Sequence, residues 1–381
     1  MLYGSKWPQY TESMKKGVQD ILDNGKVNQW TGIHVKEFEK EYAEYFGMKH
    51  AVAVSNGTVS LEIALRALNI GEGDEVIVTP RSFIASASTV NIVGATAVFA
   101  DVDIYSQNMT SESISIKITD KTKAIILVHL AGYPCDMDPI VALCNKHDIF
   151  LIEDCAQAHG AKYKDKYVGT FGIISSWSFC QDKIISTAGE GGMLLTNDTY
   201  LYKKMWSYKD HGKDYDIVHN CEKSNGYKYI HKTLGTNYRM TEIQALIGRE
   251  SLKMLDMWIK IRNINADILT RKLNKLKCVY ISQVKLGLHA YYKYYLHLND
   301  KYISLRDTII QDLNNKGIQA SQGSCGRLYD EECLVKYICV LPDNSSKLMD
   351  NSIMLPVDIT FDQDSMEKIA DIVYSTLKSH E

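Results

Sequence analysis

Short apolar runs alternate with helical periodicity between about residues 50 and 250. The run at 51–54 breaks at a Ser-Asn-Gly-Thr turn, and apolar residues then recur at the i, i+3, i+4, i+7 spacing of a helix face. Further apolar runs lie at 75–79, 97–102, 124–128, 149–152, 177–179 and 193–196, and a helix is expected near 138–147. Apolar strands separated by helices are typical of a parallel sheet that helices cover on both faces. The pattern predicts an α/β fold with a mostly parallel central sheet.

The pattern changes after residue 240. Residues 241–277 contain almost no Gly or Pro and predict one long helix or two in sequence. A strand at 291–298, a helix at 305–315, a short strand at 318–320 and a closing helix at 365–377 are expected beyond it. We therefore predict two domains: a large one at 1–250, which includes an N-terminal helical segment, and a smaller α+β domain at 251–381.

Length, charge and hydropathy argue against several classes of protein. A chain of 381 residues is longer than a single hydrophobic core usually serves, which agrees with two domains. Its 43 basic and 46 acidic residues lack the basic excess of a nucleic-acid-binding protein. No run approaches the ~18 uncharged apolar residues of a membrane helix, and the first residues lack the basic and apolar regions of a signal peptide. We expect a cytoplasmic protein that binds neither nucleic acid nor membrane.

The nine cysteines include no CxxC pair. Disulfide scaffolds are short and rich in cysteine, and zinc sites use closely spaced pairs. We therefore expect reduced cysteines that act as small hydrophobic residues, and no metal site.

The first candidate for chemistry is Asp154, in the segment Glu153–Gly160, which reads Glu-Asp-Cys-Ala-Gln-Ala-His-Gly. Asp154 follows an apolar run, at the edge where open α/β sheets bind ligands. A carboxylate in that position needs a cationic or hydrogen-bonding partner. The alternative is that Asp154 caps a helix or has a purely structural role.

Two further features could contact a ligand: Lys183 and the turn at 55–58. Lys183 precedes an apolar pair and the Gly-rich segment 189–192, where the backbone can lie close to a ligand. A desolvated lysine can form a Schiff base, although a single lysine is more often a surface residue. The turn at 55–58 begins a helix and could hold a phosphate with help from the Ser178 hydroxyl, or could be an ordinary helix cap. A phosphate cradle, an acid and a lysine together are what pyridoxal phosphate requires.

With these motifs in place, the sequence resembles the nucleotide-sugar aminotransferases of the DegT/StrS family, which are pyridoxal-phosphate enzymes of fold type I. The matching segments occur in the family's order, at 55–58, 80–85, 153–160, 178–183, 189–192 and 235–242. One departure is Asp358, which follows a Leu-Pro-Val segment where the family often has histidine; it concerns contacts to the substrate and not to the cofactor.

The resemblance implies a role for each matching residue. Lys183 holds the cofactor as a Schiff base and moves protons during the reaction, and Asp154 pairs with the pyridine nitrogen. Gln157 lies near the ring and its phenolic oxygen, and Phe83 stacks on the ring. Residues Gly57, Thr58 and Ser178 bind the phosphate.

The resemblance also implies a homodimer with shared active sites. Asn237 matches a residue that reaches the phosphate of the neighbouring subunit's cofactor. Arg239 is expected to face the same shared cleft and to contact substrate.

The implied activity is transfer of the amino group of L-glutamate to a nucleotide-linked 4-keto-6-deoxyhexose, with amination at C4 favoured over C3. A dehydratase branch of the family has histidine in place of the lysine, and Lys183 argues against it. Another pyridoxal-phosphate reaction and a non-enzymatic regulator with the same fold remain as alternatives. The sequence does not indicate which nucleotide is bound.

Overall fold

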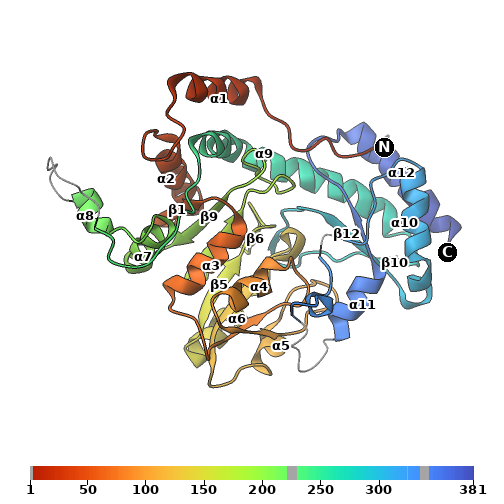
Figure 1. Ribbon diagram of the computed structural model, residues 1–381. Helices are drawn as coiled ribbons and strands as arrows, with labels where there is room; N and C mark the ends of the chain where they lie inside the picture. Colours follow the sequence, from red (N-terminus) through yellow and green to blue (C-terminus); the bar gives the residue numbers. More distant parts are fainter. Residues whose placement is uncertain (1–2, 221–229, 324, 335–342) are drawn as a thin grey trace.

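The computed structural model describes residues 3–220, 230–323, 325–334 and 343–381. A seven-stranded sheet in the order β1-β9-β8-β5-β4-β2-β3 forms its centre (Figure 1). The strands are β1 (His50–Val54), β2 (Glu75–Val78), β3 (Thr96–Phe99), β4 (Thr122–Val128), β5 (Phe150–Asp154), β8 (Ile174–Ser178) and β9 (Gly192–Thr196). Strand β9 runs antiparallel to β1 and β8, and the other pairings are parallel. The predicted α/β fold with a mostly parallel sheet is confirmed.

Helices cover both faces of this sheet because its strands are apolar on both faces. One face packs against α3 (Gly57–Ala67), α4 (Ala85–Ile92) and α7 (Thr199–Lys209). The other packs against α2 (His34–Phe46), α6 (Met137–His147) and the first half of α9 (Glu242–Leu273). Successive side chains of one strand enter different cores: Val52 and Val54 lie in the first, and Ala51 and Ala53 in the second.

A smaller core, separate from the two cores that flank the central sheet, contains the far half of α9. It packs on α10 (Arg306–Asn315), α12 (Gln363–Ser379) and a sheet of β10 (Val279–Tyr280), β12 (Tyr294–Leu298) and β13 (Ser352–Leu355). Along α9, Leu252 and Ile259 belong to the core that also contains α2 and α6, whereas Ala266 and Leu273 belong to the smaller core. The helix therefore connects the two cores, and the predicted division at residue 250 stays a prediction.

The long helical region is a single helix of 32 residues, with Thr241 as its N-cap. The Thr241 hydroxyl accepts from the backbone N–H of Gln244, and the Gln244 side chain accepts from the N–H of Thr241. The strand expected at 318–320 is wrong: Ile318 makes one isolated bridge, to Tyr3. Residues 291–293 also lie outside β12, since Tyr291 has a φ of 46°, which is incompatible with a strand.

The remaining elements surround these cores. A small sheet has the order β11-β6-β7, formed by Gly287–Leu288, Lys162–Tyr163 and Lys166–Tyr167. The other helices are α1 (Glu12–Asn24), α5 (Ser111–Ser115), α8 (Tyr215–Asn220) and α11 (Asp343–Asn351), and three short 3-10 turns cover Leu130–Gly132, Asp300–Leu305 and Leu328–Asp330. In Figure 1, α8 projects from the left edge and both chain ends lie near α12.

Two findings bear on the compositional predictions. Within the described part of the chain, no helix combines the length and apolar character needed to cross a membrane. The described cysteines are free thiols, and most of them are buried; Cys221 and Cys339 lie outside the described residues.

Candidate active site

A cavity of about 590 Å³ opens where the parallel strands end. Strands β1, β2, β5 and β8 end at residues 54, 78, 154 and 178, and the segments that follow them line its wall. This is the edge at which open α/β sheets bind ligands. The predicted site residues brought together here are Gly57, Thr58, Phe83, Asp154, Gln157, Ser178 and Lys183.

At one end of the cavity the start of α3 faces Ser178. Asn56 is the N-cap, and its side chain accepts a hydrogen bond from the backbone N–H of Val59 at 3.0 Å. A Cβ atom on Gly57 would lie 2.6 Å from the Ser178 Cβ, so only glycine fits between the helix and β8. Free N–H groups at a helix start, a serine hydroxyl and no intervening side chain fit a phosphate.

Asp154 lies at the end of β5 and is 5% exposed. Its Oδ2 accepts from the Ser86 hydroxyl at 2.9 Å and its Oδ1 from the backbone N–H of Ala156 at 3.1 Å. Burial raises the pKa of this carboxyl above its usual value, although both hydrogen bonds and the charge of Lys183 act in the other direction. The element that follows Asp154 is the strand β6 (Lys162–Tyr163) and not a helix, so Asp154 is not a helix cap. A buried carboxylate at a cavity wall fits a cationic partner such as a protonated ring nitrogen.

Lys183 enters the same cavity from the loop that follows β8, and its side chain is 15% exposed, so it is not a surface lysine. Its Nζ donates to the Tyr292 hydroxyl at 3.4 Å and lies 3.6 Å from Oδ1 of Asp182. Asp182 and Tyr292 line the cavity, and sequence reasoning missed both. Asp182 stands next to Lys183 in the chain and could have been considered, whereas Tyr292 is 109 residues away and no local pattern points to it.

Gln157 and Phe83 occupy other parts of the wall. Gln157 is buried, and its Oε1 accepts from the backbone N–H of Ala131 at 2.7 Å, which fixes the amide. Phe83 is 59% exposed, so its ring has a free face that a planar ligand could cover.

Asn237 and Arg239 do not line this cavity. Arg239 Nη1 bonds to Oδ1 of Asp210 at 2.7 Å, and Asp210 is fully buried. Lys213 Nζ lies 3.1 Å from the same Asp210 oxygen, so Arg239 takes part in a buried charge cluster and has a structural contact of its own. The Asn237 side chain is exposed and accepts only a long hydrogen bond, from the Arg239 N–H at 3.4 Å.

Beneath Asp154, the buried residues His129, Glu153 and Cys155 bring their ligand atoms within 4.8 Å of one another. The Glu153 oxygens already accept from His129 Nε2 at 3.1 Å and from the backbone N–H groups of Gly169, Phe171 and Gly172. These bonds tie β5 to the segment before β8. They give Glu153 a structural role that requires no ion.

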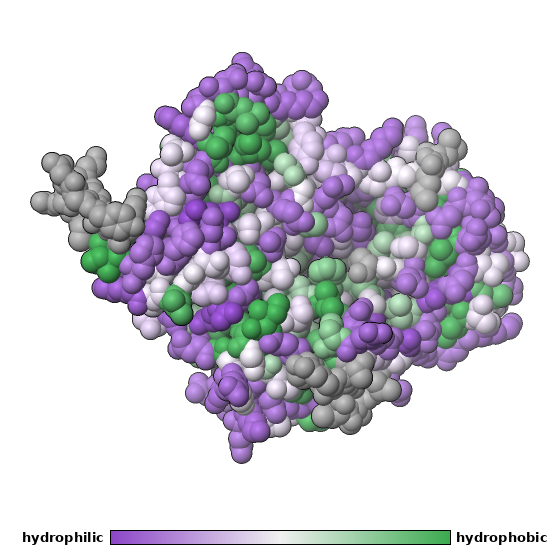
Figure 2. Space-filling view, viewed as in Figure 1, coloured by the Kyte–Doolittle hydropathy of each residue, from purple (hydrophilic) through white to green (hydrophobic). Residues whose placement is uncertain are grey.

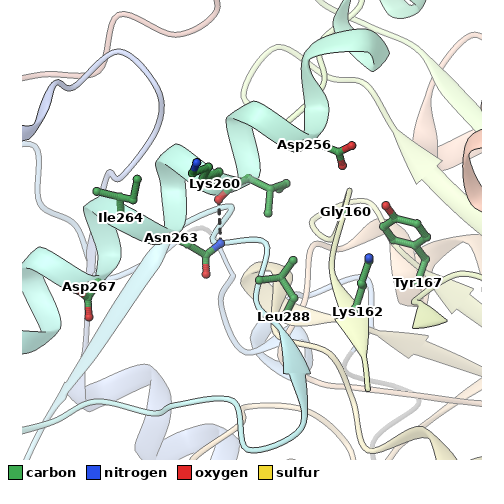
Figure 3. Close-up of a pocket in the computed structure, with 10 residues that line it drawn as sticks. Gly160, Lys162, Tyr167, Asp256, Lys260, Asn263, Ile264, Asp267 and Leu288 are labelled. Carbon is green, nitrogen blue, oxygen red and sulfur yellow. Dashed lines mark hydrogen bonds between the residues drawn. The ribbon is translucent and has the colours of Figure 1, made fainter. Parts of the chain in front are cut away.

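A separate groove of about 470 Å³ lies between α9 and the small sheet. Figure 3 shows Asp256, Lys260, Asn263 and Asp267 along α9, facing Lys162 and Tyr167. None of the site residues predicted from the sequence lines this groove.

Comparisons with known proteins agree with this geometry. Residues 8–374 match the DegT/DnrJ/EryC1/StrS aminotransferase family. The chain is 44% identical over 285 residues to the GDP-perosamine synthase of Escherichia coli O157:H7, covering 75% of each chain. It is 40% identical to the GDP-perosamine synthase of Caulobacter vibrioides, covering 82% of each. An aminotransferase structure from Psychrobacter cryohalolentis superposes with a TM-score of 0.96 and 43% identity, covering 98% of this chain and 99% of that one.

The resemblance seen in the sequence motifs is therefore confirmed, and so are the enzyme class and the cofactor of the family, pyridoxal phosphate. The phosphate cradle at Gly57, the buried carboxylate of Asp154 and the enclosed amine of Lys183 fit that cofactor. The chain belongs to the DegT/DnrJ/EryC1/StrS aminotransferase family and is a sugar aminotransferase.

Proposed function

We propose that this enzyme transfers the amino group of L-glutamate to C4 of a GDP-linked 4-keto-6-deoxyhexose. The observation that carries the proposal is one cavity that holds Lys183, Asp154 and the phosphate cradle, in a chain whose relatives are named GDP-perosamine synthases. Perosamine is a 4-amino-4,6-dideoxy sugar, which favours C4 over C3. The GDP moiety is supported by the same names.

Pyridoxal phosphate would supply an aldehyde that carries the amino group and a ring that withdraws electrons from the reacting carbon. Lys183 would hold the cofactor and, when released, move a proton at its Nζ. Asp154 would keep the ring nitrogen protonated, because an ionised carboxylate stabilises a neighbouring cation. Phe83 would cover the ring, and Gln157 would fix its orientation.

The phosphate would lie against the start of α3. Gly57 and Thr58 would contribute backbone N–H groups, and Ser178 its hydroxyl. These contacts hold a doubly charged group without a cationic side chain, so a large share of the cofactor affinity should come from this end of the cavity.

We also propose that the active unit is a homodimer. Several large apolar side chains are exposed, namely Leu22, Val27, Trp30, Ile33, Phe83 and Leu234. Figure 2 shows a hydrophobic patch near α1. Apolar surface of this kind is typical of an interface. Asn237, exposed and outside the cavity of its own subunit, would reach the phosphate in the partner's cavity.

The test is an assay of the cofactor-loaded enzyme with L-glutamate and a panel of ketosugars linked to GDP, dTDP or UDP. We expect 2-oxoglutarate to form in step with an amino sugar, fastest with the GDP-linked 4-ketosugar, and NMR to place the amine at C4. An amine at C3 would support the alternative transaminase. Sugar turnover without 2-oxoglutarate would indicate a dehydratase and contradict the proposal.

A further inference from the structure

The amine of Lys183 is held by two side chains from different parts of the chain. Lys183 Nζ donates to the Tyr292 hydroxyl at 3.4 Å, and that hydroxyl donates a short hydrogen bond to Oδ2 of Asp182. The other carboxylate oxygen of Asp182 lies 3.6 Å from Nζ. The three polar groups therefore form a closed cluster at one wall of the cavity.

Tyr292 is itself firmly placed. It is 2% exposed, and two lysine amines lie near its ring, with Lys183 Nζ 4.8 Å and Lys293 Nζ 4.9 Å from the ring centroid. Its backbone carbonyl accepts from Nη1 of Arg262, a residue of α9, at 3.3 Å. The backbone carbonyl of Lys183 accepts from Trp7 Nε1 at 2.9 Å. Both members of the contact are thus anchored at the backbone as well as at the side chain.

The protonation states agree with this arrangement. Burial raises the pKa of the Tyr292 hydroxyl well above its ordinary value, so the hydroxyl keeps its proton and can donate to Asp182. Burial opposes ionisation of Asp182, but the charge of Lys183 and the hydrogen bond from Tyr292 outweigh it and lower the pKa of this carboxyl. The amine therefore faces two acceptors, the Tyr292 hydroxyl oxygen and the Asp182 carboxylate, and the Tyr292 proton is donated to Asp182.

Lysine has a flexible four-carbon side chain, and a proton carrier must sit close to its working position to be effective. We propose that Tyr292, oriented by Asp182, is a positioning residue that keeps the Lys183 amine directed into the cavity whenever it is not covalently linked. Tyr292 lies two residues before β12, in the part of the chain predicted as the second domain, and its side chain packs in the same core as α2 and the first half of α9.

The test compares Tyr292→Phe, which removes only the hydroxyl, with a matched control, Tyr294→Phe. Tyr294 is equally buried two residues later, but its hydroxyl bonds to Thr270 at 2.9 Å within the small core. The first readout uses cofactor-free enzyme: the rate at which added pyridoxal phosphate becomes linked to the lysine, followed by visible absorbance. The second is the half-reaction of loaded enzyme with L-glutamate alone.

We expect Tyr292→Phe to slow linkage and to lower kcat of the half-reaction by about tenfold to a hundredfold, with KM changed by less than about threefold. Asp182→Asn should act in the same direction and offers a second test if Tyr292→Phe folds poorly. Tyr294→Phe should stay within about twofold of wild type in both readouts.

Equal behaviour of Tyr292→Phe and Tyr294→Phe would overturn the role of Tyr292. The inference rests on the assignment of Lys183 under Proposed function, and that assignment is checked separately by borohydride reduction and peptide mapping of the wild-type enzyme. Cofactor attached to another lysine would overturn both. Because no sugar is present in either readout, a wrong sugar substrate would leave the result unaffected.

Discussion

At the scale of single residues, the proposed chemistry depends on a few charged groups that the sheet keeps largely from solvent. Asp154 and Lys183 line one cavity, and each is mostly buried. Burying an isolated charge is costly, so buried charged groups that line a cavity are typically compensated by a bound ligand. The absence of an ion pair to Asp154 among the described residues is consistent with a role toward the cofactor.

Lys183→Ala should abolish turnover, because none of the other described residues that line the cavity carries an amine that could hold the cofactor and move the proton. The purified variant should lack the visible absorbance of lysine-linked cofactor while keeping the far-ultraviolet circular dichroism of the wild type. Transamination at the wild-type rate would show that the lysine is wrongly assigned.

Asp154→Asn should lower kcat by orders of magnitude with little change in folding, because the amide keeps the shape but removes the negative charge that would stabilise the protonated ring nitrogen. Steady-state kinetics and a thermal melt of the same sample check both parts. A fall of less than about tenfold, equivalent to ~1.4 kcal/mol of barrier, would indicate a structural residue.

His159 is expected to make stability depend on pH. It is fully buried, neither ring nitrogen has a hydrogen-bond partner among the described residues, and burial together with the charges of Lys183 and Arg262 lowers its pKa to about 3. The unfolded chain binds this proton near pH 6.5, so the free energy of unfolding should fall by about 1.4 kcal/mol per pH unit from there toward pH 3.

His159→Phe removes this titration and keeps a ring against Trp177 and Phe179. The melting temperatures of the two cofactor-free proteins should therefore diverge between about pH 7.5 and about pH 5.5, with the wild type losing more. If the melting temperatures of the wild type and His159→Phe fell equally over this pH range, His159 would be protonated readily in the folded state.

At the scale of elements, we expect the start of α3 to control cofactor affinity. Gly57→Ala would place a Cβ 2.6 Å from the Ser178 Cβ, so the helix start or β8 must move and the phosphate donors move with it. We expect the affinity for pyridoxal phosphate to fall by more than about tenfold, and the affinity for pyridoxal, which lacks the phosphate, to fall much less. Equal losses for the two ligands would argue against a phosphate cradle.

Gly71→Ala provides the control for this substitution. The nearest atom to a Cβ at Gly71 is the Val93 carbonyl oxygen at an ordinary 3.5 Å, and the position has no positive φ. This variant should bind both ligands as the wild type does.

The elements also show what the sequence could and could not predict. Apolar residues on both faces of a strand, as at 51–54, predict a covered parallel sheet because burial sets that pattern locally. The reversed direction of β9 depends on the path of the chain, which leaves no periodic signal. Residues 318–320 alternate apolar and polar side chains as a strand would, but only Ile318 makes a bridge, to Tyr3, so no ladder forms. Asp154 and Lys183 lie in motifs, whereas Tyr292 reaches the cavity only through tertiary packing.

At the scale of the whole molecule, one chain would supply an incomplete site. Asn237 is exposed, lies outside the cavity of its own chain and bridges Asp210 through its backbone. If it instead contacts the partner's cofactor phosphate, Asn237→Asp should repel that phosphate and inactivate the enzyme. The alternative is that Asn237 only stabilises the turn before α9, in which case the change should be mild.

Mixing two inactive proteins, Lys183→Ala and Asn237→Asp, separates a shared site from a self-contained one. In a heterodimer with shared sites, one site receives both substitutions and the other receives neither, so activity should return, up to about half of the wild-type value per heterodimer. If each subunit supplied its own Lys183 and Asn237, every site would keep one defect and activity would stay absent. Heterodimers purified with two different affinity tags make the comparison quantitative, and a persistent lack of activity in them would contradict the shared site without affecting the enzyme class.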